Sequence, residues 1–392
     1  METDYLIIGG GPAGIAAAQA IRENDSEGRV LVVDQEGHCL YSKIIFHHFL
    51  SGKISKDKLF LRSEQFYEKY KIELTKGRVV EGRYDEKRVK LESGQQIEFD
   101  KLIIASGGQP RRLEVQGAQD AFLSFYSLQD AVNLKDKVQN AQKVLVVGGG
   151  FLTLDLLDGL AELGKKIVLI MRDDYLLQNR LGEAGGKILQ KSLQKAGVKI
   201  IANAQVEKIS SEKAVRTAIL DNGERVDFDL GVSAIGLKID LDFAKSLGLA
   251  IDKGIVTDKR MRSSLEDVYA CGDVCQFEDP FSHEWSLPGN YLFAQESGKI
   301  AGLNASGGDV LSQTYTMVSK KVLSCQLFFC GSADKKYQMS DMASGERYAA
   351  IFEKEGKVVG ISTLNLLQKT KIARQSLGTK IKTDDLLKEL LS

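Results

Sequence analysis

The feature that most constrains the fold is an internal repeat of a short apolar strand, a glycine-rich turn and a helical segment. The first copy spans residues 4–14 (DYLIIGGGPAG), and the second copy spans residues 143–153 (KVLVVGGGFLT). Each copy leads into another apolar run, at 30–33 after the first and at 167–170 after the second. A strand, a glycine turn, a helix and a further strand form the βαβ unit of a doubly wound parallel sheet. The sequence therefore predicts an α/β fold with two Rossmann-like domains.

Two further strand-like runs suggest that the second domain is inserted into the first. Residues 101–105 end in a Ser-Gly-Gly turn just before the second repeat, and residues 267–271 end in Gly-Asp after it. Between 79 and 99, alternating charged runs resemble a small β-meander. From about residue 310 the pattern changes to short strands with polar turns and a helical tail, which predicts an α+β domain. The predicted boundaries are 1–110 and 236–308 for the first dinucleotide domain, 111–235 for the inserted domain and 309–392 for the third.

The first glycine turn has the spacing of a dinucleotide site. Gly9, Gly11 and Gly14 follow the pattern GxGxxG at the point where a strand opens into a helix. Such glycines allow a tight turn, a close approach of backbone to pyrophosphate, and close packing of helix on strand. The free N–H groups of the helix then favour an anion. Asp34, twenty residues past the last glycine, is placed to bind a ribose hydroxyl. This motif predicts a nucleotide site.

The second glycine turn is altered at two positions. Gly148 and Gly150 are present, but Thr153 stands at the third glycine position, where its side chain should hold the helix further from the strand or shift the pyrophosphate. The following strand ends in Met171-Arg172 in place of a carboxylate. Arg172 would neutralise a 2′-phosphate and favour NADPH, whereas the next residue, Asp173, would serve a 2′-hydroxyl and favour NADH. A decayed site that binds no dinucleotide is the alternative.

Composition excludes several other classes of protein. The chain balances 53 Lys+Arg with 53 Asp+Glu, which argues against nucleic-acid binding. No apolar run reaches the ~18 residues of a membrane helix, and the opening residues lack the features of a secretion signal. The five cysteines form no CxxC motif, so we expect no metal site and no disulfide scaffold. A cytoplasmic location is the simplest expectation.

These elements, in this order, resemble the two-dinucleotide-binding flavoproteins of the pyridine nucleotide–disulfide oxidoreductase class. The resemblance implies that the first turn with Asp34 binds the ADP half of FAD. The run 105–107 (ASG) resembles the Ala-Thr-Gly turn that leaves the FAD domain, and 269–273 (YACGD) resembles the second FAD motif, in which the aspartate contacts the ribityl chain. Residues 144–155 resemble the NAD(P) segment. The expected cofactors are therefore FAD and either NADH or NADPH.

The branches of this class differ in the residue that stands beside the flavin. Disulfide reductases carry a cysteine pair there and the peroxidase branch a single cysteine, whereas this chain has Ser42 at that place. The Tyr-Ser-Lys run ending at Lys43 is similar to the rubredoxin reductase branch, in which the lysine lies near the flavin N5 edge. The family commonly pairs this lysine with a glutamate on the NAD helix, where this chain has Asp155. The resemblance implies that Lys43 and Asp155 are the catalytic residues.

The predicted function is transfer of electrons from a nicotinamide through FAD to a small iron protein, a rubredoxin or a ferredoxin-like protein. Two alternatives stay open: an NAD(P)H oxidase that makes hydrogen peroxide, and a flavin electron-transfer subunit with a vestigial nucleotide site. No nucleic acid or membrane partner is expected, and the oligomeric state is open. The residues predicted to bind cofactor are Gly9, Gly11, Pro12, Ala13, Gly14, Asp34, Gln35, Lys43, Val79, Ala105, Ser106, Gly107, Gly272 and Asp273 for FAD, and Gly148, Gly150, Phe151, Leu152, Arg172 and Gly236 for the nicotinamide nucleotide.

Overall fold

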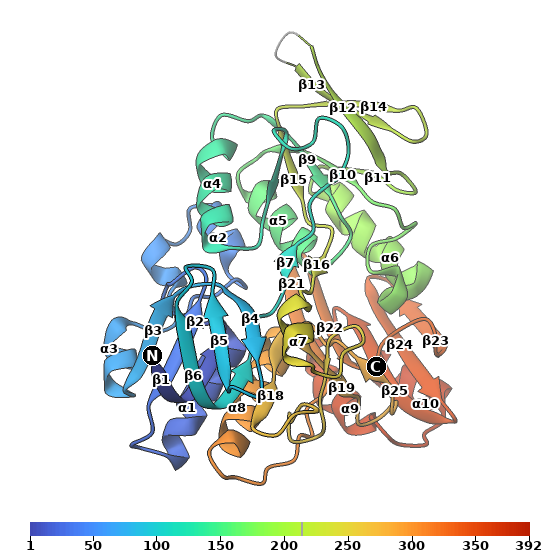
Figure 1. Ribbon diagram of the computed structural model, residues 1–392. Coiled ribbons are helices and arrows are strands. Elements are labelled where there is room, and N and C mark those ends of the chain that lie inside the picture. The colour runs from blue at the N-terminus through green and yellow to red at the C-terminus, as the bar shows by residue number, and fades with distance from the viewer. Residues whose placement is uncertain (213–214) are drawn as a thin grey trace. The chain divides into compact units, whose positions relative to one another are not determined.

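The two glycine turns lie in two different compact units of the computed structural model, which describes residues 1–212 and 215–392 (Figure 1). Unit 1 comprises Met1–Tyr41, Phe60–Gln109 and Ile239–Met317. Unit 2 comprises Ser42–Leu59, Pro110–Lys238 and Val318–Ser392. Each unit therefore collects segments that are far apart in the sequence. The chain passes from one unit to the other at residues 41–42, 59–60, 109–110, 238–239 and 317–318. The third and fourth of these crossings lie at the short strands β7 (Gln109–Pro110) and β16 (Leu237–Lys238).

Unit 1 is built around a seven-stranded sheet in the order β3-β2-β1-β6-β5-β4, with β18 paired to β6. The pairs β1–β2, β1–β6, β2–β3 and β6–β18 are parallel, whereas β4–β5 and β5–β6 are antiparallel and form the predicted meander. The central strands β1 and β2 contain the short apolar runs 5–8 and 30–33, which are buried, as is typical of parallel strands covered on both faces. The strand bounds are β1 (Glu2–Ile8), β2 (Val30–Asp34), β3 (Ile72–Lys76), β4 (Val79–Arg83), β5 (Arg88–Leu91), β6 (Gln96–Ile104) and β18 (Val268–Ala270).

Two helices of unit 1, α1 (Pro12–Asn24) and α8 (Tyr291–Ala305), pack through glycines. A Cβ added at Gly298 would lie 2.1 Å from the carbonyl oxygen of Ala13, and one added at Gly302 would lie 2.3 Å from that of Ala17. The backbones therefore approach more closely than any larger residue permits, and α8 holds the start of α1 in place. The remaining elements of unit 1 are α3 (Glu64–Lys69), α7 (Asp242–Leu247), η2 (Gly272–Val274) and a small sheet of β17 (Ile255–Val256), β19 (Cys275–Glu278) and β20 (Trp285–Ser286).

Unit 2 contains a second parallel sheet in the order β11-β10-β9-β15-β8. Its strand bounds are β8 (Phe122–Ser124), β9 (Lys143–Val147), β10 (Lys166–Ile170), β11 (Val198–Ile201) and β15 (Leu230–Ser233). A three-stranded antiparallel sheet follows β11 in the chain and consists of β12 (Val206–Glu212), β13 (Val215–Leu220) and β14 (Arg225–Phe228). The helices of this part are α2 (Phe46–Leu50), η1 (Lys56–Leu59), α4 (Leu128–Val138), α5 (Phe151–Glu162) and α6 (Gln178–Lys195).

The C-terminal part of unit 2 is a five-stranded sheet in the order β21-β22-β25-β24-β23. The pairs β22–β25, β24–β25 and β23–β24 are antiparallel. The core of this part consists of the buried central residues of β24 and β25 together with Leu386, Leu387 and Leu390 of the last helix. The bounds are β21 (Met317–Val322), β22 (Cys325–Gly331), β23 (Gln338–Ser344), β24 (Arg347–Lys354), β25 (Lys357–Leu364), η3 (Leu367–Lys369), α9 (Thr370–Ser376) and α10 (Thr383–Leu391). The predicted α+β character of the C-terminal region is confirmed.

Candidate functional site

The first glycine turn lies between three strands of the unit 1 sheet. The amide of Gly9 donates to the Val33 carbonyl at 2.8 Å, and the amide of Ala105 donates to the Ile8 carbonyl at 2.8 Å. Gly9 has φ +109°, and a Cβ there would lie 2.3 Å from the Ala105 carbonyl oxygen. Only glycine fits this position, and it brings the predicted Ala105–Gly107 turn against the first motif. Ser106 itself is exposed at this edge.

The helix that follows this turn has a free N-terminus. Gly11 is the N-cap of α1 and Pro12 its first residue, and the first turn carries neither a side-chain cap nor an acidic residue. A Cβ added at Gly11 would meet nothing within 4 Å, so the space beside it is open. A Cβ added at Gly14 would lie 1.9 Å from the Gly9 carbonyl oxygen, which shows how closely the helix sits on the turn. Unpaired amides facing open space suit a phosphate group.

Asp34 stands beside this turn at the end of β2. Its Oδ2 accepts a hydrogen bond from the Gly10 amide at 2.8 Å, and its Oδ1 accepts from the amides of Glu36 at 2.9 Å and Gly37 at 3.0 Å. The carboxylate is thus held in place by backbone amides, and its lone pairs leave room for a ribose hydroxyl. Gln35 is exposed next to it, whereas Val79 begins β4 and packs against the core of unit 1.

The second predicted FAD motif lies against the first turn of α1. Gly272 begins η2 with φ +73°, and a Cβ there would lie 2.9 Å from the Cβ of Ala13. The Gly272 amide donates to the Ser297 hydroxyl at 3.0 Å, which ties this motif to α8. Asp273 follows and is partly exposed. Residues 9–14, 34, 105 and 272 therefore converge within unit 1, and their free amides, open space and fixed carboxylate fit the ADP half of FAD.

The second glycine turn, in unit 2, repeats this geometry. The Gly148 amide donates to the Ile170 carbonyl at 3.0 Å, and the Ala234 amide donates to the Val147 carbonyl at 2.8 Å. A Cβ at Gly148 would lie 2.3 Å from the Ala234 carbonyl oxygen, as one at Gly9 would from Ala105. Gly150 caps α5 and faces open space, and so does Gly236, two residues past Ala234. The arrangement fits a second dinucleotide.

The two altered positions of this turn have clear structural consequences. Thr153 is fully buried, and its hydroxyl donates to the Ala234 carbonyl at 3.4 Å. A Cβ at the matching Gly14 would lie 1.9 Å from the Gly9 carbonyl oxygen. That Thr153 holds α5 further from its strand, or shifts the pyrophosphate, stays a prediction. Met171 takes the place of Asp34: its Cβ lies 3.8 Å from a Cβ built on Gly149. Met171 is buried, whereas Arg172 is exposed. Phe151 and Leu152, the first residues of α5, are partly exposed.

Asp155 belongs to a buried cluster of charged and titratable groups in unit 2. Its carboxylate forms an ion pair with Lys320 of β21, and each side chain is only 12 % exposed. His47 of α2 lies between two carboxylates of α5, with Nδ1 3.7 Å from Asp155 Oδ1 and Nε2 3.8 Å from Asp158 Oδ2. The rings of His47 and His48 are 3.9 Å apart. The sequence provided no signal for Lys320, which is 165 residues away from its partner.

Burial controls the protonation of this cluster. It raises the pKa of Asp155 from 3.8 to about 6, although the charge and hydrogen bond of Lys320 act in the opposite direction. Burial also lowers the pKa of His47, and the neighbouring His48 and Lys320 lower it further. His47 is therefore neutral at pH 7, whereas Asp155 changes its charge near neutrality.

Lys43, the other predicted catalytic residue, lies just before α2. Its Nζ is 3.5 Å from the centroid of the Tyr126 ring, so an aromatic face orients the ammonium group. Ser42 next to it is buried, and its amide donates to the Leu59 carbonyl at 2.8 Å.

The cysteines are poorly suited to redox chemistry. All five are free thiols, and all but Cys39 are buried. Burial raises the pKa of each of them, to about 12 for Cys275 and Cys330. A thiol with a raised pKa supplies little of the thiolate that attacks disulfides or peroxides.

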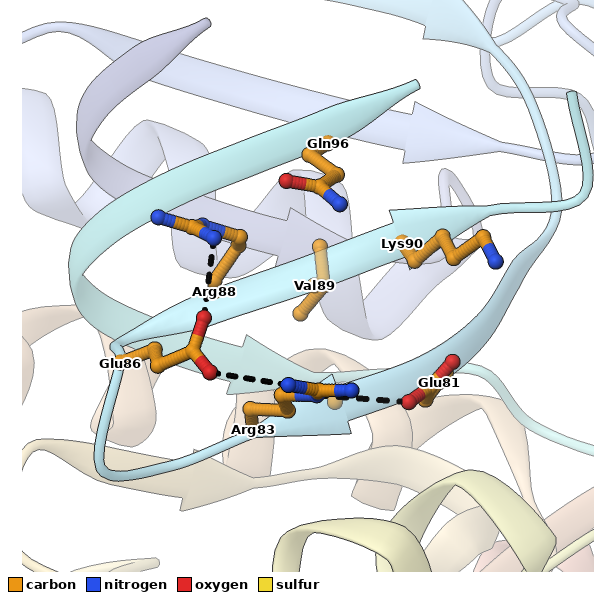
Figure 2. A pocket seen from close by; sticks show the side chains of 8 residues that line it. Glu81, Arg83, Glu86, Arg88, Val89, Lys90 and Gln96 are labelled. Carbon is orange, nitrogen blue, oxygen red and sulfur yellow. Dashed lines mark hydrogen bonds and ion pairs between the residues drawn. The ribbon is translucent and has the colours of Figure 1, made fainter. Parts of the chain in front are cut away.

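A charged hollow on unit 1 is separate from the predicted site. Figure 2 shows its lining on β4, β5, the turn between them and the start of β6. In that turn Glu86 forms ion pairs with Arg83 at 3.0 Å and with Arg88 at 2.9 Å. Its arginines are neutralised by glutamates, and none of the predicted cofactor residues lines it.

In residues 1–212 and 215–392, no group of three or more His, Cys, Asp or Glu side chains could hold a metal ion. Within the same ranges, no helix is both long enough and apolar enough to cross a bilayer.

Comparison with known proteins gives concordant matches. Residues 3–298 match the family described as pyridine nucleotide-disulphide oxidoreductase. The chain is 29 % identical over 385 residues to NADH-rubredoxin oxidoreductase of Clostridium acetobutylicum, with 97 % of this chain and 94 % of that protein covered. It is 30 % identical over 304 residues to the ferredoxin–NAD(+) reductase component of the 3-phenylpropionate/cinnamic acid dioxygenase of Photorhabdus laumondii subsp. laumondii, covering 76 % of each.

A solved structure matches over the whole chain. The crystal structure of NADH:rubredoxin oxidoreductase from Clostridium acetobutylicum superposes with a TM-score of 0.81 at 25 % identity, and the match covers 99 % of this chain and 100 % of that one. The predicted fold class, with two Rossmann-like domains and a C-terminal α+β domain, is confirmed.

Proposed function

Because this chain belongs to the pyridine nucleotide-disulphide oxidoreductase family, we propose that it is an FAD-dependent NAD(P)H oxidoreductase that delivers electrons to a small one-electron iron protein, a rubredoxin or a ferredoxin. Relatives over most of the chain carry such activities in their names. Bound FAD would accept a hydride and give up electrons singly, which a nicotinamide cannot do. The chain's residues bind and orient both nucleotides.

We assign FAD to residues 1–110 and 236–308. Gly9, Gly11 and the first turn of α1 would hold the pyrophosphate, because their amides face open space. Asp34 would accept a hydrogen bond from a ribose hydroxyl, because the amides of Gly10 and Glu36 already fix the orientation of its carboxylate. Gly272 lets the second FAD motif approach α1, which supports a contact between Asp273 and the ribityl chain.

We assign the nicotinamide nucleotide to residues 111–235. Gly148, Gly150 and the start of α5 would hold its pyrophosphate, and Gly236 keeps the neighbouring space open. Buried Met171 offers no acceptor for a ribose hydroxyl, so binding at this turn relies on phosphate contacts. We assign residues 309–392 to a third domain. Its Lys320 is the ion-pair partner of Asp155.

The observation that carries the proposal is the pair of matching glycine turns in a chain whose five thiols all have raised pKa values. Without a thiol relay, electrons must leave the flavin directly, which suits a one-electron acceptor. Five unpaired thiols also support a cytoplasmic location, where thiols stay reduced.

The test is anaerobic mixing of the FAD-loaded protein with NADH or NADPH in a stopped-flow spectrometer, followed by reoxidation with a rubredoxin, a ferredoxin or oxygen. We expect rapid bleaching of the flavin by at least one nicotinamide and faster reoxidation by an iron protein than by oxygen. Faster reoxidation by oxygen with release of hydrogen peroxide would identify an oxidase instead. No bleaching by either nucleotide would favour an electron-transfer subunit with a vestigial second site, the alternative that Thr153 and Met171 support.

A further inference from the structure

Arg180 lies beside the second glycine turn, although it is 27 residues past Thr153 in the sequence. Its guanidinium carbon is 5.8 Å from the centroid of the Phe151 ring and 5.8 Å from that of Phe329. The two rings meet edge to face, with centroids 5.5 Å apart. Phe151 is the first residue of α5 and directly follows the N-cap Gly150. The cation therefore lies near the side chain of the residue that begins α5, and the N-terminus of a helix favours an anion.

The guanidinium has few protein partners for its five donors. Nη1 donates to the Ala333 carbonyl at 3.5 Å, a long contact. Among residues 1–212 and 215–392, no carboxylate lies within 4 Å to form an ion pair with it. Burial lowers the pKa of Arg180, and the charge of Asp334 offsets this only in part. A mostly buried charge without a counter-ion is costly, which points to an anion that completes the site.

The backbone around Arg180 is strained in a way that fixes this position. Leu177, the N-cap of α6, has φ +55°, a left-handed conformation that is strained for a bulky residue. Gly182 interrupts the helix with φ +58°, and a Cβ there would lie 2.8 Å from Met339 Cε. Arg180 sits between these two residues. Strained backbone held in place by packing is common at ligand-binding positions.

We propose that Arg180 is the cationic residue of the second nucleotide site and binds the pyrophosphate of NAD(P)H. This inference rests on the proposed function, because it assumes that a nicotinamide nucleotide occupies the Gly148–Gly150 turn. The hydroxyl of buried Thr153 donates to the Ala234 carbonyl. A planar guanidinium with paired donors would add a charge-assisted contact to those of the backbone amides at this turn. Arg172, which is exposed near the predicted ribose position, would recognise only a 2′-phosphate.

The experiment measures binding of ADP-ribose, 2′-phospho-ADP-ribose and adenosine to the oxidised, FAD-loaded protein by calorimetry. We expect Arg180→Met to weaken both pyrophosphate ligands about 10- to 100-fold, the loss of a charged hydrogen bond, and to leave adenosine binding unchanged. Arg180→Lys should weaken them several-fold, because it keeps the charge but not the paired donors. The matched control, Arg172→Met, should weaken only the 2′-phosphorylated ligand.

Equal ADP-ribose affinity in the wild type and in Arg180→Lys would overturn the inference, and so would a lower melting temperature for Arg180→Met with unchanged ADP-ribose affinity. The latter result would identify Arg180 as a brace between α6 and the C-terminal sheet. If the protein proves to be an oxidase, the proposed function fails while the expected results for Arg180 stay the same. A vestigial second site is distinguishable, because the wild type would then bind no ADP-ribose and neither NADH nor NADPH would bleach its flavin. That result would overturn the inference as well.

Discussion

Replacing Lys320 by methionine should destabilise the protein in a strongly pH-dependent way. The substitution keeps the volume of the side chain but leaves Asp155 without its cation, in a position where both groups are 12 % exposed. In the wild type the pKa of Asp155 is about 6, against 3.8 when exposed. Between these two values the folded state binds more protons than the unfolded state, so stability falls as the pH rises. Lys320 lowers the pKa of Asp155, and its removal must raise that pKa further.

The magnitude follows from the proton that the variant retains. The wild type loses the Asp155 proton near pH 6. For each further pH unit over which Asp155 stays protonated in the folded variant, the free energy of unfolding of the variant falls by about 1.4 kcal/mol relative to the wild type. If Asp155 stays protonated in the folded variant up to pH 8, the loss of unfolding free energy relative to the wild type is about 3 kcal/mol larger at pH 8 than at pH 5. For a domain of about 150–250 residues this corresponds to a fall of about 6–12 °C in melting temperature. His47 changes the stability of the variant in the same direction. Because its pKa lies below 6.5 in the folded wild type, the wild type loses stability as the pH falls below 6.5. Loss of Lys320 raises this pKa, so the variant loses less stability at pH 5 than the wild type does.

The assay is thermal unfolding followed by circular dichroism at pH 5 and pH 8. Lys199→Met is the matched control, because the Lys199–Glu224 pair has a 2.9 Å contact but side chains that are 62 % and 38 % exposed. Such a pair contributes less than about 1 kcal/mol at either pH. The same measurement in an Asp155→Asn background should remove most of the pH dependence and leave only the part that His47 contributes. A Lys320→Met effect that is equal at both pH values, or no larger than the control, would refute the reasoning.

Two further predictions concern the cofactor sites. Gly14→Ala should prevent normal folding of unit 1, because the new Cβ would lie 1.9 Å from the Gly9 carbonyl oxygen. Gly11→Ala should keep the melting temperature of the FAD-free protein, because its Cβ meets nothing within 4 Å, but this variant should lose flavin on purification. Equal stability of the two variants would contradict this packing. Lys43→Met should retain FAD but slow its reduction by the nicotinamide at least several-fold, and an unchanged rate in stopped-flow measurements would remove the role that the family resemblance gives to Lys43.

The sequence predicted the parallel sheets and both glycine turns because these features are local. A buried strand, a glycine turn and a helix are encoded within about 30 consecutive residues, and the steric reason for glycine lies in the neighbouring backbone. The family membership and the fold class predicted from these motifs are confirmed. The contact of Gly148 with Ala234 could also have been predicted, because the Ala-x-Gly pattern of residues 105–107 recurs at residues 234–236. The role of each site residue stays a prediction.

Other features depend on contacts that no local pattern encodes. Lys320 is an ordinary lysine in a polar strand, and only the folding of β21 against α5 makes it the partner of Asp155. Arg180 follows a Leu-Leu-Gln-Asn run without any phosphate-binding spacing, and its position depends on Phe329 of a distant strand. Strand β23 (Gln338–Ser344) was not predicted, because an edge strand with mostly polar, exposed residues shows no apolar alternation.

The two altered positions of the second turn affect different parts of nucleotide recognition. The backbone geometry that serves the phosphates is retained, since Gly148 makes the same contact with Ala234 that Gly9 makes with Ala105. The carboxylate that would select a ribose 2′-hydroxyl is lost, because buried Met171 stands there and exposed Arg172 follows. A carboxylate disfavours NADPH by repelling its 2′-phosphate, and no such charge stands at position 171. We therefore expect this chain to discriminate less between NADH and NADPH than a site that ends its second strand in an acid.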